Sequence, residues 1–282
     1  MRYIIAQLLL VAILLIARLP IDQGLTLRVL DIGQGDSIYL RLPSHDDVLV
    51  DAGPDDRVLG QLGRYMPFAD RTIELLIVSH NHQDHIGGLE AILSEYTVNH
   101  IWLSGATHPT QTFHELLSLI EAKNIPVTFV KAGDVNTIGD SELTVLHPPT
   151  TMVDRVPLDP HNATIVLKVS YKKICIILTG DIEERHEVAV VDTVRQLAIP
   201  IECPVLKVTH HGSRYGTFKP FLEAVKPEVG LVSVGAKNRY GHPTTALLDR
   251  LKVAKVKVYR TDWQGTITVK SNGERYSTKV ER

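Results

Sequence analysis

The stretch His80-Asn81-His82-Gln83-Asp84-His85 gathers imidazole and carboxylate side chains within six residues. Apolar residues 73–78 precede it and two glycines follow it, which predicts a buried strand that ends where these side chains begin. Residues two apart on an extended backbone point the same way, so His80 and His82 can bind one ion. A turn at Gln83 would direct Asp84 and His85 toward a second ion. Imidazole and carboxylate suit zinc, manganese or iron(II), and two such ions about 3.5–4 Å apart form a common hydrolytic centre.

The composition is that of a folded globular protein with a large core. The chain has 282 residues, of which 44% are hydrophobic and 22% charged, enough for one large domain or two closely joined halves. The net charge of −2 provides no overall basic field of the kind that attracts nucleic acids. Two cysteines, Cys175 and Cys203, make no disulfide framework, and Cys175 in the apolar segment 174–178 is expected to be a buried, unreactive thiol.

The N-terminus is strongly apolar. Residues 3–17 contain one polar side chain, Gln7, and follow a single basic residue, Arg2. This segment suits the core of a signal peptide and falls short of the roughly 20 residues that span a bilayer comfortably. No clear cleavage site follows, so residues 1–22 are expected to be an uncleaved anchor or a removed signal, with a buried element of a cytosolic fold as the alternative. Export would place the protein at the outer side of the bacterial cytoplasmic membrane, with residues 3–17 as a membrane tether.

Apolar segments of strand length alternate with helical patterns along residues 23–282, which we expect to form a single domain. Two successive mixed halves, the second beginning near residue 164, predict a layered α/β protein with sheets packed face to face and helices outside. The expected strands are 25–30, 37–42, 48–50, 73–78, 101–104, 127–130, 164–169, 174–178, 205–208, 229–234, 256–259 and 266–270. The expected helices are 89–96, 114–123, 183–197, 218–225 and 244–252.

Further histidines and a carboxylate occur at the ends of these strands. Asp181 follows segment 174–178, and the pair His210-His211 follows 205–208. His242 comes after 229–234, and His161 precedes 164–169. A single histidine is usually a surface or core residue, but α/β sheets place their sites at strand ends. The shared position predicts that these residues meet the first cluster.

Several motifs carry a family resemblance. The H-x-H-x-D-H cluster, with residues 49–53 (LVDAG) and 178–181 (LTGD), resembles the metallo-β-lactamase superfamily. Three further motifs are similar to the extracytoplasmic nuclease-like domain of the ComEC DNA-uptake proteins: residues 30–36, 208–213 and 238–243. The resemblance covers about residues 25–270 and implies a four-layer αββα sandwich with a dinuclear metal site at one edge. The chain shows neither the polytopic membrane segments nor the accessory β-barrel sequence of those proteins, so a transport role is not expected.

The resemblance also implies a ligand set for two divalent ions, with zinc expected and manganese as the alternative. The first ion would be held by His80, His82 and His161, and the second by Asp84, His85 and His242, with Asp181 bridging. Relatives often have Asn where His161 stands, so His161 is either the third ligand or a bystander. The choice of last ligand lies between His211 and His242, and His242 is favoured. Relatives commonly have Asp in place of His82, and histidine there is closer to zinc-type ligation.

Other residues match supporting positions of the family. Asp51 would hold the metal-binding imidazoles from behind by hydrogen bonds. His211 would contact a phosphoryl oxygen or protonate a leaving group, and His210 would be structural. Asp84 or Asp181 would orient the attacking hydroxide and take up its proton.

These features predict a metal-dependent phosphodiesterase or nuclease that cleaves DNA with a metal-bridged hydroxide. Four basic residues are expected in the loops near the ligands: Lys207, Arg214, Lys219 and Arg239. They suit an anionic substrate, with ordinary surface charge as the alternative interpretation. The alternative is a hydrolase of a small ester, lactone, thioester or β-lactam at the same dinuclear site. A non-catalytic binding protein would not need so complete a ligand set. The sequence indicates no protein partner.

Overall fold

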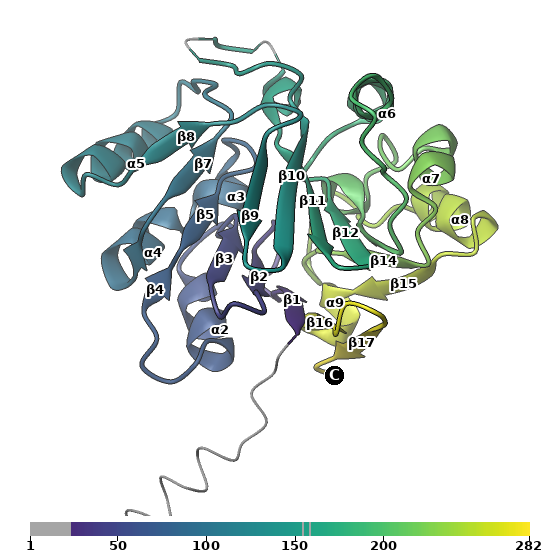
Figure 1. Cartoon of the computed structure of the whole chain (residues 1–282), viewed down its shortest axis with the longest axis horizontal. Coiled ribbons are helices and arrows are strands. Elements are labelled where there is room, and N and C mark those ends of the chain that lie inside the picture. Colours follow the sequence, from purple (N-terminus) through teal and green to yellow (C-terminus); the bar gives the residue numbers. More distant parts are fainter. Residues whose placement is uncertain (1–23, 154, 158) are drawn as a thin grey trace, which may run out of the picture.

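Two β-sheets pack face to face, and helices cover both outer faces (Figure 1). The structure is a computed structural model that describes residues 24–153, 155–157 and 159–282. The predicted N-terminal signal or anchor, residues 1–22, lies outside this described part. Among the residues that are described, no helix has the length and apolar character needed to cross a membrane.

The first sheet contains eight strands in the order β17-β16-β1-β2-β3-β5-β7-β8. Neighbours from β17 to β3 are antiparallel, whereas β3, β5, β7 and β8 run parallel. The strands are β1 (Leu25–Val29), β2 (Ile38–Arg41), β3 (Asp47–Val50), β5 (Leu75–Ile77), β7 (Ile101–Leu103), β8 (Val127–Phe129), β16 (Ile267–Ser271) and β17 (Tyr276–Val280). A separate parallel pair is formed by β4 (Thr72–Ile73) and β6 (Thr97–Val98).

The second sheet contains seven strands in the order β15-β14-β13-β12-β11-β10-β9. Strands β12 to β15 are parallel, and the other pairings are antiparallel. The strands are β9 (Val135–Ile138), β10 (Ser141–His147), β11 (Val166–Tyr171), β12 (Ile174–Leu178), β13 (Val205–Lys207), β14 (Val229–Val232) and β15 (Lys257–Arg260).

Helices form the outer layers. The first sheet is covered by α2 (Arg57–Tyr65), α4 (Leu89–Glu95) and α5 (Gln111–Ala122), and the second by α6 (Glu184–Gln196), α7 (Lys219–Val225) and α8 (Thr245–Val253). Short helical turns complete the fold: α3 (Gln83–Ile86), α9 (Thr261–Gln264), η1 (Pro160–Ala163) and η2 (Thr209–Gly212).

Strand β12 shows why this sequence forms four layers. Ile176 and Leu178 face the core between the two sheets, whereas Cys175 and Ile177 face the core beneath the helices of the second half. A strand buried on both faces needs an uninterrupted apolar run, because successive side chains point to opposite sides. The predicted αββα sandwich is confirmed.

The structure corrects the predicted elements in several places. The expected strand 73–78 is divided at Glu74, whose carboxylate accepts a hydrogen bond from Asp47 N at 2.7 Å, so β4 leaves the main sheet. Helix α2 was not predicted, because its buried residues are only Val58 and Leu62. Strands β6, β9, β10 and β17 were also missed. Because β16 pairs with β1 and β17 pairs with β16 in the first sheet, the two halves are not separate in the chain.

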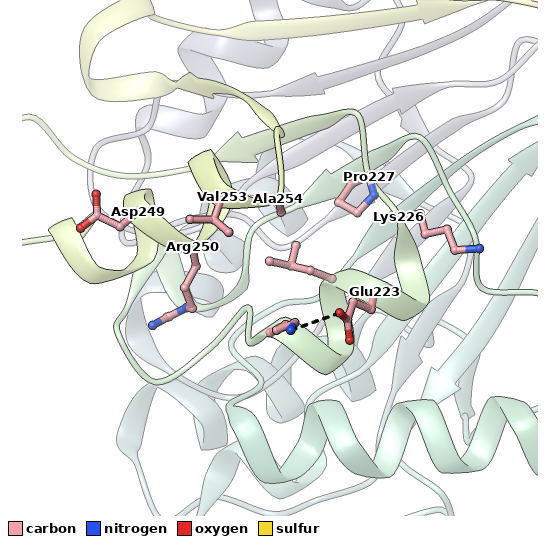
Figure 2. A pocket seen from close by; sticks show the side chains of 9 residues that line it. Glu223, Lys226, Pro227, Asp249, Arg250, Val253 and Ala254 are labelled. Carbon is pink, nitrogen blue, oxygen red and sulfur yellow. Dashed lines mark ion pairs between the residues drawn. The ribbon is translucent and has the colours of Figure 1, made fainter.

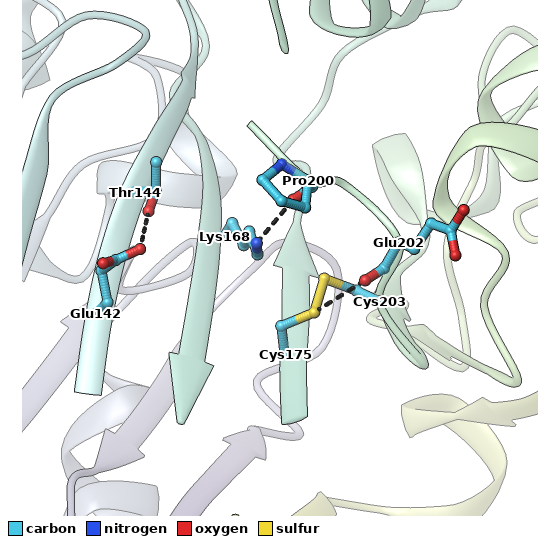
Figure 3. Close-up of a disulfide and its surroundings, with 7 residues drawn as sticks. All are labelled: Glu142, Thr144, Lys168, Cys175, Pro200, Glu202 and Cys203. Atoms are coloured by element: carbon cyan, nitrogen blue, oxygen red, sulfur yellow. Dashed lines mark hydrogen bonds between the residues drawn. A yellow bond between two sulfur atoms is a disulfide. The ribbon is translucent and has the colours of Figure 1, made fainter. Parts of the chain in front are cut away.

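Cys175 is not the free thiol that its apolar surroundings predicted. It forms a disulfide with Cys203, and the two Cα atoms lie 5.1 Å apart (Figure 3). Cys175 lies on β12 and Cys203 just before β13. These two strands are parallel neighbours, so the sheet brings together cysteines that are 28 residues apart in sequence.

Loss of this disulfide should destabilise the protein. Closing a loop of this length restricts the unfolded chain, and we expect the free energy of unfolding to fall by about 3 kcal/mol on reduction. Urea denaturation with and without a thiol reductant measures the change. The double variant Cys175→Ala/Cys203→Ala is the control, because the reductant should have no effect on it. Equal stability of oxidised and reduced wild-type protein would contradict the prediction.

Candidate metal centre

The cluster that opened the sequence analysis lies between β5 and α4, at the edge of the first sheet. His82 is extended (φ −82°, ψ 149°), and α3 begins at the next residue, Gln83. The predicted turn at Gln83 is therefore present, with Asp84 and His85 in the first turn of α3. The backbone changes direction between the two pairs of side chains, so they face different groups of neighbours.

His80 and His82 meet His161. One ligand atom from each of the three lies within 4.8 Å of the others. His161 comes from η1, where its backbone N–H donates to the Asp159 carboxylate at 2.9 Å. The structure thus brings His161 to the position that the first ion would require.

The second group contains Asp84, His85, Asp181 and His211, whose ligand atoms also lie within 4.8 Å of one another. Asp181 Oδ2 lies 3.3 Å from His85 Nε2 and 3.2 Å from His211 Nε2. The same oxygen lies 4.0 Å from His80 Nε2 in the first group. Asp181 therefore belongs to the second group and also lies close to the first.

The ends of two neighbouring strands explain this meeting. Asp181 follows β12 and His211 follows β13, and the carboxyl ends of parallel strands reach the same edge of a sheet. That edge of the second sheet faces α3 of the first half. The site is divided between the halves of the chain, and neither half contains all of it.

The donor set fits divalent metal ions. Five buried imidazole nitrogens have no hydrogen-bond partner among the described residues: His85 Nε2, His161 Nδ1, His210 Nδ1, His211 Nε2 and His242 Nδ1. Asp181 Oδ1 is likewise buried without one. Leaving a buried polar atom unpaired costs about 1–3 kcal/mol, so such atoms gathered at one place point to a ligand. Nitrogen and carboxylate oxygen are the atoms that zinc, manganese and iron bind.

The protonation of the first group suits metal binding. Burial lowers the pKa of His80, His82 and His161, that of His82 to about 4. The positive charges of neighbouring imidazoles lower the pKa of His82 further. At neutral pH these rings are therefore uncharged, which is the form that binds a metal.

Neighbouring carboxylates decide the pKa values of the two histidines in the second group. Burial alone would lower the pKa of His85 and His211, but the neighbouring carboxylates, Asp181 first among them, together outweigh it and raise both pKa values well above the usual value. Asp51 adds to this effect at His85, and Asp36 at His211. The raised pKa values of these two imidazoles indicate that the carboxylates make the second group attractive to positive charge. A divalent ion would displace them on binding.

Asp51 supports His85 from behind. Its buried carboxylate accepts hydrogen bonds from Ser79 N at 2.7 Å, Ser79 Oγ at 2.6 Å and His85 Nδ1 at 2.8 Å. With Nδ1 engaged in this way, His85 presents Nε2 to Asp181 and the second group. Asp51 thus has the supporting geometry that the sequence predicted, since partners of this kind fix ring orientation.

His242 lies outside both groups, although it was the favoured last ligand. It lines the small cavity in front of the second group, about 220 Å³ in volume, and its ring centroid lies 5.9 Å from that of His210. His211 is buried instead between Asp84 and Asp181, with Nδ1 3.0 Å from the Ser233 carbonyl. The geometry favours His211 as the last ligand, because β13 ends directly at the site.

Replacing these two histidines separately should distinguish their roles. Loss of a residue that only supports a ligand typically lowers metal affinity by roughly 10- to 100-fold. We expect His211→Ala to lower the affinity for the second metal by more than this, and His242→Ala to leave the metal content unchanged. Metal analysis after equilibrium dialysis measures both, with circular dichroism to verify folding. Loss of one metal equivalent in His242→Ala alone would assign His242 as the ligand.

His210 contacts the site more closely than a purely structural residue would. Its Nε2 lies 3.7 Å from Asp181 Oδ2, and its Nδ1 lies 3.4 Å from Glu183 Oε1. With Glu183 and His161 it forms a further set of possible ligands. This set shares His161 with the first group, so it would compete for the same imidazole.

A buried ion pair that was not predicted from the sequence lies behind the second group. Lys207 and Asp36 are both about 99% buried or more and form a short ion pair. Lys207 Nζ also donates to the Gly180 carbonyl at 3.2 Å and lies 3.8 Å from Asp181 Oδ1. Lys207 was expected to be a loop cation facing an anionic substrate, and that interpretation is wrong. A lysine within the otherwise apolar segment 205–208 was the available signal.

The other cations lie on the surface. Lys219 lines a separate groove between α7 and α8, about 580 Å³ in volume, and pairs with Glu223 at 3.6 Å (Figure 2). This groove contains none of the predicted ligands. Arg214 and Arg239 are exposed on the loops that follow η2 and β14.

Sequence comparisons agree with this architecture. Residues 30–236 match the family model of the metallo-beta-lactamase superfamily. ComE operon protein 3 of Bacillus subtilis is 30% identical over 85% of this chain, and competence protein ComA of Neisseria gonorrhoeae is 25% identical over 85%. Recombination protein 2 of Haemophilus influenzae is 27% identical over 85%. The chain spans about a third of the length of these relatives, between 28% and 32%.

Solved structures share the fold at low sequence identity. The metallo-beta-lactamase fold protein YhfI of Bacillus subtilis has a TM-score of 0.57 and 13% identity, covering 88% of this chain and all of that one. The metallo hydrolase Igni18 of Ignicoccus hospitalis has a TM-score of 0.54 and 14% identity, covering 86% and 98% of the two chains. With the family model matched over most of its length, the chain belongs to the metallo-beta-lactamase superfamily of metal-dependent hydrolases.

Proposed function

We propose that this chain hydrolyses phosphodiester bonds of DNA at a site that holds two divalent ions, zinc or manganese. The observation that carries the proposal is the position of Asp181 between two complete groups of nitrogen and oxygen donors. Ions bound there would lower the pKa of water and offset negative charge on a phosphoryl group. The first group would be His80, His82 and His161, and the second Asp84, His85, Asp181 and His211.

Asp84 is the carboxylate best placed to act on the attacking water. Its side chain is 32% exposed and lines the cavity, whereas that of Asp181 is 2% exposed. Burial opposes its ionisation, but His211 and His85 outweigh that effect and lower the pKa of Asp84 to about 2. Asp84 is therefore ionised at neutral pH, and its carboxylate can accept a hydrogen bond from a water molecule and so orient it. His242 and His210 also line this cavity, where either could contact a leaving oxygen.

Two observations support DNA as the substrate. Two of the relatives are named for competence and for recombination, processes in which DNA is taken up or exchanged. The loops beside the cavity carry the exposed cations Arg214 and Arg239, which can bind backbone phosphates. No comparable feature of the cavity favours an ester, lactone, thioester or β-lactam.

Hydrolysis assays on the metal-loaded protein test this function. The full chain, loaded with zinc or manganese, should cleave single- or double-stranded DNA and lose this activity on chelation. The same preparations should be offered small esters, lactones, thioesters and β-lactams. Turnover of one of these, with no cleavage of DNA under either metal, would replace the proposed substrate.

We further propose that the protein works outside the cytoplasm, with residues 3–17 as its export signal or tether. The disulfide between Cys175 and Cys203 supports this location, because disulfides persist in oxidising compartments and are rare in the bacterial cytosol. A fusion of residues 1–23 to alkaline phosphatase, an enzyme active only after export, should be active in bacteria. An inactive fusion, with the full chain recovered in the cytosol, would contradict export.

A further inference from the structure

An exposed aromatic ring lies at the rim of the metal cavity. Tyr240 lines this cavity with His242, yet 54% of its surface is accessible to solvent. The two rings are stacked, with centroids 5.8 Å apart and an angle of 27° between their planes. The guanidinium of Arg239 lies 5.3 Å from the Tyr240 centroid. A cation, an open aromatic ring and a second ring thus stand together beside the proposed metal ligands.

The loop that carries these residues is held in place by Asn238. Its amide nitrogen donates to the carbonyls of Gly235 at 2.9 Å and His242 at 2.8 Å. Its amide oxygen accepts from Tyr240 N at 3.2 Å and His242 N at 2.9 Å. One side chain therefore fixes the backbone on both sides of the exposed ring. A ring that is already positioned loses little conformational entropy when a ligand stacks on it.

The same loop is packed against the turn that carries His211. Thr244 N donates to the Gly212 carbonyl at 2.9 Å. A Cβ added to Gly212 would lie 2.5 Å from Pro243 Cβ, so glycine there allows the two segments to approach closely. These contacts fix the position of the Tyr240 ring relative to the second group of donor residues.

We propose that Tyr240, backed by His242 and Arg239, is a stacking platform for one nucleobase, so that the site takes single-stranded DNA. Every base has a flat aromatic face, and stacking on an aromatic side chain strengthens binding by about 5- to 150-fold per base without regard to sequence. Arg239 would contact the adjoining phosphate. In a duplex both faces of an internal base are already stacked, so only an unpaired base can reach Tyr240. This inference rests on the proposed function, because the platform serves a strand whose phosphate enters the cavity.

Two oligonucleotides of equal length and charge test the platform. One is oligodeoxythymidylate and the other is an abasic strand with the same phosphates and no bases. Fluorescence anisotropy with metal-free full-length protein measures binding apart from cleavage. Tyr240→Ala should weaken binding of the thymidylate strand by about 5- to 150-fold. Tyr240→Phe should bind it as wild type does, and the abasic strand should not distinguish the variants.

Tyr215 offers a matched control. It is 58% exposed and lies beside Arg214 at 5.8 Å, but it does not line the cavity. Tyr215→Ala should therefore bind the thymidylate strand as wild type does. Unchanged binding in Tyr240→Ala, an equal loss for the abasic strand, or an equal loss in Tyr215→Ala would each overturn the platform.

Cleavage by metal-loaded wild-type protein separates this inference from the proposed function. If the wild type cleaves DNA and Tyr240→Ala has unchanged affinity and unchanged KM, the platform is wrong and the phosphodiesterase stands. If the wild type binds the thymidylate strand through Tyr240 but cleaves no DNA with zinc or manganese, the proposed hydrolysis is wrong and the binding platform stands.

Discussion

Replacing Asp84 and His85 together with alanine should abolish hydrolysis and remove the second metal. Both residues belong to the second donor group, and His85 also joins that group to Asp51. Stabilisation by a catalytic metal is worth several kcal/mol in the transition state, so we expect kcat/KM to fall by at least about a thousandfold. Metal analysis should show the loss of one equivalent, because His80, His82 and His161 are unchanged.

His114→Ala is the matched control for that experiment. His114 is an exposed histidine on α5 and belongs to neither donor group. Its replacement removes an imidazole without changing the site, so metal content and activity should both equal those of wild type. Activity that survived in the Asp84→Ala/His85→Ala variant would refute the assignment of this site, whatever the metal content.

Replacing Lys207 with methionine should produce the largest loss of stability. Methionine has nearly the volume of lysine, but it leaves the buried carboxylate of Asp36 without its cation. The carboxylate of Asp181 also loses the nearby positive charge of Lys207. Removing one partner of a buried ion pair typically costs about 3–5 kcal/mol. Urea denaturation of the metal-free protein measures the free energy of unfolding.

Two further variants serve as controls for the effect of Lys207→Met. Lys219→Met removes a lysine that is 82% exposed and pairs with Glu223, and it should change stability by no more than about 1 kcal/mol. In the double variant Asp36→Asn/Lys207→Met the unpaired charge is gone, so much of the lost stability should return. A cost below about 1 kcal/mol for Lys207→Met would mean that water or a rearrangement compensates Asp36.

The sequence was sufficient for the local chemistry. His80, His82, Asp84 and His85 lie within one short stretch, and the extended backbone followed by a turn at Gln83 decides which way each points. Backbone periodicity is local, so it can be read without the fold. Apolar runs such as β12 likewise predicted buried strands and the αββα layers. Helix α2 buries only Val58 and Leu62, so it has few apolar residues that could mark it as a helix in the sequence.

Contacts between distant segments could not be predicted from local sequence patterns. His211 and His242 have the same chemistry and both follow strands, yet only His211 lies against Asp181, because β13 is the parallel neighbour of β12. The same pairing joins Cys175 to Cys203.

The family, the layered fold and the side chains able to bind metal therefore follow from the sequence alone. The tertiary structure decided which of them meet, and it turned Lys207 from an apparent surface cation into the buried partner of Asp36. The physical reason is that strand order within a sheet depends on the packing of the whole chain. Identical residue types at equivalent strand ends therefore reach different environments.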